Sequence, residues 1–311
     1  MHTILGAGGP VSNALTRLFI TNKDELRLVS RRCPGIAPPH TWVKADLLNF
    51  KELFSAAHGS KVLYLCAGLQ YNKEIWRHQW PLIIENVMKV TKETGARLIF
   101  FDNVYMYGLV QGVMTEDTPY NPCSRKGEVR AKIATRLMEE VKAGNMNASI
   151  ARAADFYGAT DSMNSFFDRM VLDKLSKKQK ALWLGDPDTL HSFTLIEDAA
   201  KGVFTLGQHP ESDNHIWHLP TAPALHGHDF IHLAASAIGA NARYIKINKF
   251  ILKAMGLFNP LIRETVEMYY QYQYDYHFSS ERFEKTFHIR PTSYREGISR
   301  LANTFYKAER V

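Results

Sequence analysis

A glycine-rich segment near the N-terminus carries the clearest chemical signal in the sequence. Residues 5–12 read Leu-Gly-Ala-Gly-Gly-Pro-Val-Ser and lie between an apolar run expected to be a strand and an amphipathic run expected to be a helix. Glycines permit a tight turn in which backbone amides approach a diphosphate, and the helix N-terminus adds about half a positive charge. We therefore expect a dinucleotide site, and its loop residues are Gly6, Gly8, Gly9, Pro10 and Val11.

The end of the second expected strand predicts which dinucleotide binds. An NAD-specific site places Asp or Glu near this strand end, where the carboxylate accepts hydrogen bonds from the ribose 2′-hydroxyl. Here the chain reads Ser30-Arg31-Arg32, which offers a hydroxyl and two guanidinium groups to a 2′-phosphate. The sequence thus favours NADP over NAD. The alternative is that both arginines are merely solvent-exposed loop charges.

Further short motifs follow the loop in a fixed order. They are Ala45-Asp46-Leu47, Cys66-Ala67-Gly68, residues 152–158 (Arg-Ala-Ala-Asp-Phe-Tyr-Gly), residues 191–200, His218-Leu219-Pro220 and residues 278–283. In this order they resemble the extended short-chain dehydrogenase/reductase superfamily, specifically its NAD-dependent epimerase/dehydratase family. Gly6 and Gly9 match that family's Gly-x-x-Gly-x-x-Gly, and the small Ser12 takes the third place. The resemblance covers nearly the whole chain.

The resemblance implies further contacts to the cofactor. Asp46 and Leu47 correspond to the adenine edge, where the carboxylate accepts a hydrogen bond from the exocyclic amine. Cys66, Ala67 and Gly68 correspond to the small residues that line the ribose and nicotinamide. The element at 152–158 is similar to the family's Arg-Pro-x-x-Val-Tyr-Gly, and it adds Phe156 and Tyr157 to the expected cofactor-binding residues.

The family's chemistry depends on a serine, a tyrosine and a lysine, and this chain departs from all three. Asn103 takes the serine's place on the strand end at 101–108, and its amide can still donate to a carbonyl oxygen. In the Tyr-x-x-x-Lys helix, Lys126 falls at the tyrosine position and Arg130 at the lysine position. Arg130 can bind ribose hydroxyls and supply positive charge. Lys126 is then the candidate proton donor.

Alternatives to these catalytic roles remain open. Lys126 can instead be an exposed residue at a helix N-terminus, and Tyr105 is the phenol best placed to substitute for it. Other candidate phenols are Tyr107, Tyr120 and Tyr157. His191 can titrate near neutral pH or be a structural histidine. The tyrosine-rich segment 268–278 can be a packing segment or an aromatic wall of a substrate pocket.

The elements expected around these residues form an α/β fold. Strands are expected at 3–5, 26–29, 61–66, 97–101 and 149–152, and helices at 11–19, 50–57, 80–93 and 126–143. Short apolar strands that alternate with helices indicate βαβ units and a doubly wound parallel sheet, the Rossmann fold. We expect a cofactor-binding domain at 1–157 plus about 191–212. A smaller mixed α/β substrate domain is expected at about 158–190 plus 213–311.

Composition and charge exclude several classes of protein. The 311 residues are 45% hydrophobic and 22% charged, as in globular chains. No run of 18 apolar residues occurs, and the start does not resemble a signal peptide, so we expect no membrane partner. The cysteines Cys33, Cys66 and Cys123 match no metal motif, which predicts reduced thiols, no metal and a cytoplasmic location. The net charge of +7 is spread along the chain, which favours a phosphate-bearing ligand over nucleic acid.

The resemblance implies an NADP-dependent oxidoreductase or epimerase. Its substrate is expected to be a small molecule with a hydroxyl or carbonyl group, and sugars and nucleotide sugars are the leading candidates. The altered Tyr-x-x-x-Lys motif favours an alternative, a non-catalytic NADP-binding sensor or scaffold. The preserved motifs of the substrate domain favour an enzyme. A homodimer is an expectation from the family alone.

Overall fold

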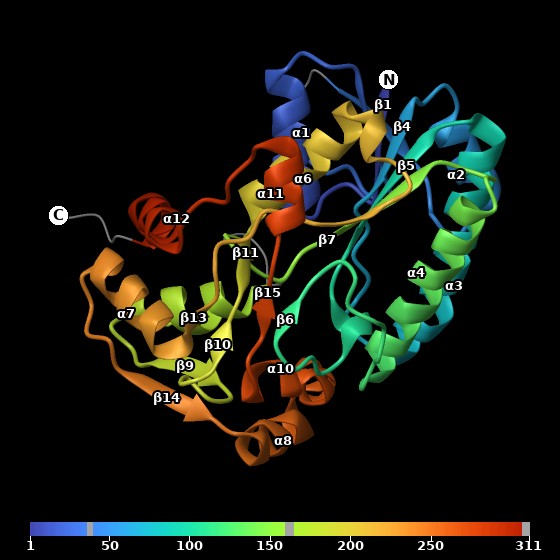
Figure 1. Cartoon of the computed structure of the whole chain (residues 1–311). Helices are drawn as coiled ribbons and strands as arrows, with labels where there is room; N and C mark the ends of the chain where they lie inside the picture. The colour runs from blue at the N-terminus through green and yellow to red at the C-terminus, as the bar shows by residue number, and fades with distance from the viewer. Residues whose placement is uncertain (36–39, 159–164, 307–311) are drawn as a thin grey trace. The chain divides into compact units, whose positions relative to one another are not determined.

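The chain forms two compact units. The computed structural model describes residues 1–35, 40–158 and 165–306. The first unit comprises Met1–Gly108, Pro119–Arg152 and Ala199–Leu219, and the second comprises Leu109–Thr118, Ala153–Asp198 and Pro220–Val311. Figure 1 traces both units along the chain from blue to red. Each unit has its own hydrophobic core, so each is described by itself.

A seven-stranded sheet forms the centre of the first unit, in the order β12-β7-β5-β4-β1-β2-β3. Every neighbouring pair in it is parallel. The strands are β1 (His2–Leu5), β2 (Leu26–Ser30), β3 (Thr41–Lys44), β4 (Val62–Leu65), β5 (Arg97–Asp102), β7 (Ala148–Arg152) and β12 (Ile216–His218). The predicted doubly wound parallel sheet is therefore confirmed. Its strand order reverses between β1 and β4, which defines the switch point of the fold.

The helices of this unit connect successive strands. They are α1 (Pro10–Thr21), α2 (Phe50–Ala57), α3 (Lys73–Thr94), α4 (Arg125–Lys142) and α6 (Ile196–Gln208), with the 3₁₀ turns η1 (Tyr105–Tyr107) and η3 (Pro210–Ser212). The predicted helix at 80–93 was wrong at its start, because α3 begins at Lys73. The side chain of Asn72 caps α3 by accepting hydrogen bonds from the amides of Glu74 and Ile75. Pro81 lies inside the helix without ending it.

The main core of the first unit includes residues from the sheet, α3 and α4. Trp80, Ile83 and Val87 come from α3, Phe100 comes from β5 and Leu137 comes from α4, and all five side chains are buried. Because parallel strands are covered on both faces, a strand such as β4 is a short apolar run. Such runs predicted β1, β2, β4, β5 and β7. Strands β3 and β12 were not predicted, since Thr-Trp-Val-Lys and Ile-Trp-His include polar residues.

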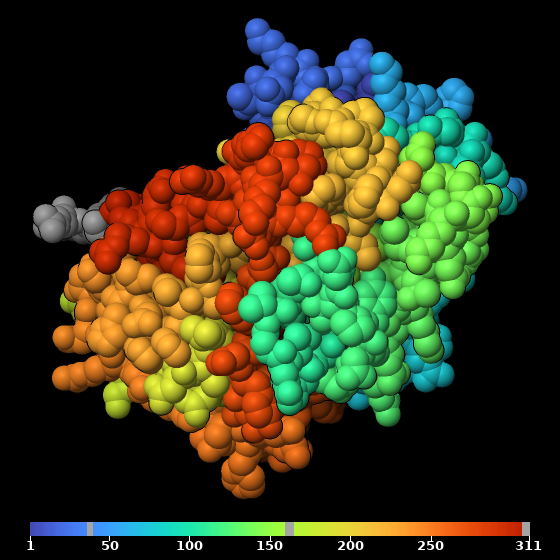
Figure 2. All heavy atoms as spheres, viewed as in Figure 1, coloured from blue at the N-terminus to red at the C-terminus, as the bar shows by residue number. Residues whose placement is uncertain are grey.

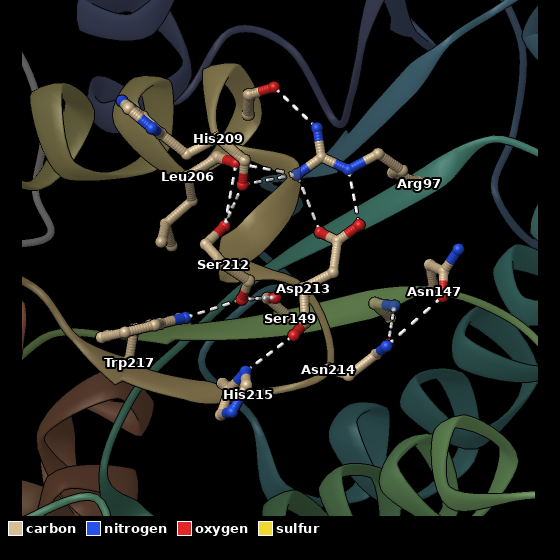
Figure 3. A network of polar contacts seen from close by, with 12 residues as sticks. Arg97, Asn147, Ser149, Leu206, His209, Ser212, Asp213, Asn214, His215 and Trp217 are labelled. Carbon is tan, nitrogen blue, oxygen red and sulfur yellow. Dashed lines mark hydrogen bonds and ion pairs between the residues drawn. The ribbon is translucent and has the colours of Figure 1, made fainter. Parts of the chain in front are cut away.

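Arg97 joins the start of β5 to the end of α6 (Figure 3). Its Nε and Nη2 atoms lie 2.6 and 2.8 Å from the two carboxylate oxygens of Asp213. The same guanidinium donates to the carbonyl oxygens of Leu206, Gly207 and His209. The last carbonyls of a helix have no partner within the helix, and one arginine satisfies several of them here.

The second unit consists of short strands and helices. Three strand pairs are parallel, β6 with β15, β8 with β11 and β9 with β14, and β10 with β13 is antiparallel. The strands are β6 (Val113–Met114), β8 (Asp155–Tyr157), β9 (Ala181–Leu184), β10 (Leu190–His191), β11 (Phe193–Leu195), β13 (Leu225–His226), β14 (Tyr244–Ile247) and β15 (His277–Phe278). The helices are α5 (Asp173–Ser176), α7 (Gly227–Ile238), α8 (Lys249–Phe258), α9 (Pro260–Thr265), α10 (Tyr270–Gln273), α11 (Glu281–Phe287) and α12 (Tyr294–Leu301), with η2 (Asp168–Leu172), η4 (Val266–Met268) and η5 (Ala302–Tyr306). Its hydrophobic core contains several buried aromatic residues, among them Phe167, Trp183, Phe193 and Phe230.

The turn after β5 yields a prediction about stability. Gly108 has φ +68° and ψ −143°, and a Cβ atom there would lie 1.9 Å from the carbonyl oxygen of Asn121. Gly95 also has φ +68°, but its Cβ would meet no atom within 4 Å. We expect Gly108→Ala to lower the free energy of unfolding by at least about 2 kcal/mol more than Gly95→Ala does. Urea denaturation measures both, and equal losses would contradict the close contact.

Candidate functional site

The glycine-rich loop lies at the switch point of the sheet. Gly6 directly follows β1 and has φ +84°. A Cβ atom at this position would lie 2.4 Å from the Cα atom of Ala67, which follows β4. Only glycine fits this approach, because the backbone conformation and the contact both exclude a side chain. In doubly wound folds, ligands bind outside the carboxyl ends of the strands at this point.

The start of α1 fits a diphosphate. Helices α2, α3 and α4 are capped by Asn49, Asn72 and Ser124, whose side chains accept hydrogen bonds from first-turn amides. The residue before α1 is instead Gly9, which has no side chain, and Pro10 is the first residue of the helix. The amides at this helix end therefore point outward with the positive end of the helix dipole. This end of α1 suits the diphosphate of a nicotinamide dinucleotide.

Ser12 fixes the conformation of the loop. Its hydroxyl accepts a hydrogen bond from the amide of Gly8 at 3.0 Å and donates one to the carbonyl of Gly9 at 2.8 Å. The side chain is buried against the start of α1. Sequence reasoning judged Ser12 only by its size and missed these two bonds. The sequence signal for these bonds was a hydroxyl residue three positions after Gly9, within reach of the loop backbone.

The segment at the end of β2, which is expected to contact the adenosine ribose, forms a compact turn. The hydroxyl of Ser30 donates to the carbonyl oxygen of Arg32 at 2.6 Å and accepts from Nε1 of Trp42 at 3.1 Å. The side chains of Arg31 and Arg32 are exposed. Ser30 therefore shapes the turn that carries two exposed guanidinium groups. Such groups can pair with a phosphate in bidentate geometry.

The other expected cofactor-binding residues of this unit follow β3 and β4. Oδ1 of Asp46 accepts a hydrogen bond from the amide of Leu48 at 3.0 Å, which fixes its carboxylate in a turn. The amide of Cys66 donates to the carbonyl of Leu5 at 2.9 Å and continues the β1–β4 pairing toward Ala67. Burial raises the pKa of the Cys66 thiol to about 12. This thiol is thus protonated at neutral pH and suits a lining role rather than a reactive one.

Asp102, the last residue of β5, lies between two buried arginines. Its Oδ1 atom lies 3.1 Å from Nη1 of Arg130 on α4, and its Oδ2 atom lies 3.8 Å from Nε of Arg152 on β7. All three side chains are buried. Burial raises the pKa of Asp102, while the two guanidiniums oppose that shift. Protonation would leave two buried cations without a counterion, so the pairing favours the carboxylate.

Two phenols and a histidine extend this charge cluster. Arg152 donates from Nη1 to the hydroxyl of Tyr107 at 2.7 Å and from Nη2 to the hydroxyl of Tyr120. The hydroxyl of Tyr107 shares a further hydrogen bond of 2.8 Å with Nε2 of His218. Sequence reasoning missed Arg152 and His218 as parts of this network. Tyr107 and Tyr120, considered as catalytic phenols, serve here as partners of Arg152.

Arg130 is held among aromatic rings. Its guanidinium carbon lies 3.9 Å from the centre of the Trp80 ring and 4.7 Å from that of Trp76, in cation–π geometry. Burial lowers the pKa of Arg130, and the Asp102 carboxylate opposes this shift. Its Nη1 atom is the one that faces Asp102, whereas its Nε atom meets no acceptor within the described part of the chain. This Nε donor suits a ligand hydroxyl such as that of a ribose.

Lys126 is buried in the first turn of α4. Its side chain is 0% exposed, and Nζ lies 4.4 Å from the centre of the Tyr71 ring. The alternative of an exposed residue at a helix N-terminus is therefore wrong. The helix begins at Arg125, but Gly127 packs so closely on the carbonyl of Tyr105 that its Cβ would lie 2.5 Å away. This close approach packs the first turn of α4 against η1.

Asn103 and Tyr105 are linked through the backbone of the turn. The Asn103 amide donates to Oδ1 of Asp102 at 2.9 Å, and the Tyr105 amide donates to Oδ1 of Asn103 at 3.1 Å. Because Oδ1 of Asn103 is an acceptor here, its side-chain NH₂ group is oriented as the donor for a ligand. The ring of Tyr105 stacks on Trp76 at 6.1 Å. The structure thus brings Asn103, Tyr105 and Arg130 together around Asp102.

The second unit holds the remaining expected residues. Phe156 and Tyr157 lie on β8, and Tyr157 is buried, with its ring 5.8 Å from that of Tyr294. On the same strand, Oδ2 of Asp155 accepts a hydrogen bond from the hydroxyl of Tyr272 at 2.6 Å and lies 3.2 Å from Nε2 of His191. The His191 ring stacks on Tyr272 at 4.7 Å. Tyr272, from the tyrosine-rich segment, therefore packs within this unit.

Comparisons with known proteins identify the family from the sequence and the fold from solved structures. The sequence model of the NAD dependent epimerase/dehydratase family matches residues 2–219. No curated protein sequence matches this chain. A double mutant of DesIV, a dTDP-glucose 4,6-dehydratase from Streptomyces venezuelae solved with NAD and DAU, has 14% identity and a TM-score of 0.77, with 97% of this chain and 96% of that chain covered. The UDP-glucose 4-epimerase of Thermotoga maritima, solved with UDP-glucose, has 12% identity and a TM-score of 0.78, with 98% of each chain covered. MoeE5 in complex with UDP-glucose and NAD has 16% identity and a TM-score of 0.78, with 97% of each chain covered.

The cluster around Asp102 yields a second prediction. Asp102→Asn removes the counterion of two buried guanidiniums, and we expect it to lower the free energy of unfolding by about 3–5 kcal/mol. Adding Arg130→Met to this variant removes one of the uncompensated charges. The double variant should therefore lose less stability than the sum of the two single losses. Chemical denaturation of the four proteins measures this coupling, and strict additivity would contradict it.

Proposed function

Because the chain belongs to the NAD-dependent epimerase/dehydratase family, we propose that it is an NADP-dependent oxidoreductase or epimerase. Its reaction takes place at a hydroxyl or carbonyl group of a sugar or nucleotide sugar. The start of α1 at the switch point carries this proposal, since Gly6 and Gly9 keep side chains away from the helix end that a diphosphate requires. The cofactor, when bound, supplies the hydride acceptor or donor.

The first unit binds the cofactor in this proposal. The loop at 6–11 holds the diphosphate, and the exposed Arg31 and Arg32 recognise the 2′-phosphate. Asp46 and Leu47 contact the adenine, and residues 66–68 line the ribose and nicotinamide. The Nε donor of Arg130, which meets no acceptor within the described residues, binds a ribose hydroxyl. Phe156 and Tyr157, on β8 of the second unit, stay cofactor-binding predictions from the family resemblance, and we propose that the second unit binds the substrate.

The proposed substrate class rests on the similar structures and on charge. DesIV is a dTDP-glucose dehydratase, and the Thermotoga maritima enzyme was solved with UDP-glucose. A nucleotide sugar carries two phosphates, which suits a chain of net charge +7. We therefore assign a nucleotide sugar as the first substrate class to test.

Three residues of the first unit carry the proposed chemistry. Asn103 donates from its side-chain NH₂ to the substrate oxygen, an orientation that the Tyr105 amide enforces. Lys126 supplies or takes the proton, and its burial keeps its ammonium out of bulk water. Arg130 adds positive charge beside the ribose. Tyr105 is the alternative proton donor because it lies on the same turn.

One observation favours a second function, a non-catalytic NADP-binding sensor. The guanidinium of Arg130 is paired with Asp102 at 3.1 Å, so part of its charge is neutralised inside the protein. Cofactor binding without turnover is the outcome that separates the sensor from the enzyme.

The cofactor assignment yields a third prediction. We expect Arg31→Ala and Arg32→Ala each to weaken NADP binding by about tenfold and to leave NAD binding unchanged, because only NADP carries the 2′-phosphate. Arg77→Ala, at another exposed arginine of the first unit, is the matched control and should change neither affinity. Isothermal titration calorimetry measures all four proteins. Tighter binding of NAD than of NADP by the unaltered chain would contradict the assignment.

The catalytic assignment yields a fourth prediction. Incubation with NADP and a panel of dTDP- and UDP-sugars should give an oxidised, dehydrated or epimerised product, detected by NMR. Lys126→Met keeps the aliphatic stem but removes the proton donor, so kcat should fall at least about 100-fold while NADP affinity stays within a factor of three. A matching loss in Tyr105→Phe, with activity kept in Lys126→Met, would reassign the proton to Tyr105. NADP binding with no product across the panel would support the sensor.

A further inference from the structure

Helix α8 of the second unit exposes large apolar side chains to solvent. Phe250 is 81% exposed, Leu257 is 77% exposed and Phe258 is 90% exposed. Soluble proteins rarely leave several such residues uncovered on one short helix. In Figure 1, α8 follows β14 at the edge of its unit, and Figure 2 shows the orange spheres of this stretch at the surface.

The opposite side of α8 anchors the helix to its own unit. Leu252 is buried and belongs to an apolar cluster with Leu184, Tyr269 and Tyr272. Gly256, four residues later, faces α9 so closely that its Cβ would lie 3.0 Å from the Cα of Arg263. A helix presents residues four apart on one face. The exposed face that carries Phe250, Leu257 and Phe258 therefore points away from the unit.

The stretch of chain that contains α8 is positively charged. Residues 243–263 contain five basic residues and no Asp or Glu, so this stretch carries five of the seven net positive charges of the chain. The five are Arg243, Lys246, Lys249, Lys253 and Arg263, and all are exposed. Lys246 is paired with Asp186 at 2.8 Å. Lys249 and Lys253 lie on α8 itself, beside the apolar residues.

We propose that α8 docks the protein onto an anionic lipid bilayer. Exposed Phe and Leu side chains enter the boundary between headgroups and acyl chains, and lysines beside them contact anionic headgroups. A second copy of this chain is the less favourable occupant, because it would place two such positive stretches against each other. Nucleic acid would match the lysines but leave the apolar side chains in water.

Docking of this kind requires no membrane-spanning segment. Among the residues at 1–35, 40–158 and 165–306, no helix combines the length and apolarity needed to cross a bilayer. The sequence-based expectation of no membrane partner considered only spanning segments and a signal peptide. Exposure of Phe250 and Phe258 becomes visible only when the packing of α8 is known. The proposal concerns the second unit alone and is independent of the proposed enzymatic function.

Vesicle co-sedimentation of the full chain tests this proposal. We expect binding to phosphatidylcholine vesicles that contain about 30% phosphatidylserine, little binding to pure phosphatidylcholine, and weaker binding as salt increases. Phe250→Ser combined with Phe258→Ser should weaken binding at least tenfold, as should Lys249→Glu combined with Lys253→Glu. Lys178→Glu combined with Lys180→Glu makes the same charge change at exposed positions before β9, and it should keep binding.

Three results would overturn the proposal. The first is the absence of binding to the anionic vesicles by the unaltered chain. The second is equal loss of binding in the control at Lys178 and Lys180, which would indicate attraction by net charge alone. The third is a dimer in analytical ultracentrifugation that the Phe250 and Phe258 variant dissociates, which would make a second copy the occupant. Circular dichroism confirms that each variant is folded, which is expected because the changed side chains are exposed.

Discussion

The buried carboxylate of Asp102 is the constraint on which the first unit depends. A buried charge is costly in free energy unless an opposite charge lies within a few ångströms of it. Asp102 finds Arg130 on α4 and Arg152 on β7, at 3.1 and 3.8 Å. It also accepts a hydrogen bond from the amide of Asn103. One side chain therefore fixes the position of a helix, a neighbouring strand and the turn that carries the candidate catalytic amide.

This constraint accounts for how the first unit accommodates an arginine at the lysine position of the family pattern. An arginine at the lysine position introduces a larger cation with five N–H donors, and burial of that cation requires a carboxylate. Asp102 provides it, and the rings of Trp76 and Trp80 cover the guanidinium faces. Arg130 and Asp102 are therefore best understood as one buried ion pair. The same carboxylate also accepts a hydrogen bond from the backbone amide of Asn103, and the Asn103 side chain in turn accepts one from the amide of Tyr105.

Sequence reasoning predicted the parallel sheet and the glycine-rich loop because both are encoded locally. Buried strands such as β4 are short apolar runs, and the loop is continuous in sequence. The start of α3 was missed because Pro81 and the charged residues before Trp80 obscured its pattern, while the capping role of Asn72 depends on backbone geometry. The burial of Lys126 also depends on tertiary contacts. The pairing of Asp102 joins residues 28 and 50 positions apart, which no local pattern reveals.

The positions of the positive side chains, rather than the net charge, distinguish the binding roles proposed for the two units. A net charge of +7 alone suggested a phosphate-bearing ligand. In the first unit, cations such as Arg130 are buried against rings and a carboxylate, where they act at short range and are little screened by salt. Arg31 and Arg32 are exposed beside the sheet and suit a ligand phosphate. In the second unit, Lys249 and Lys253 are exposed beside apolar side chains, so their field acts on a surface rather than on a bound small molecule. Side chains of the same charge thus serve different purposes, because their burial and neighbours determine how far their electric field reaches and which ligand or surface they attract.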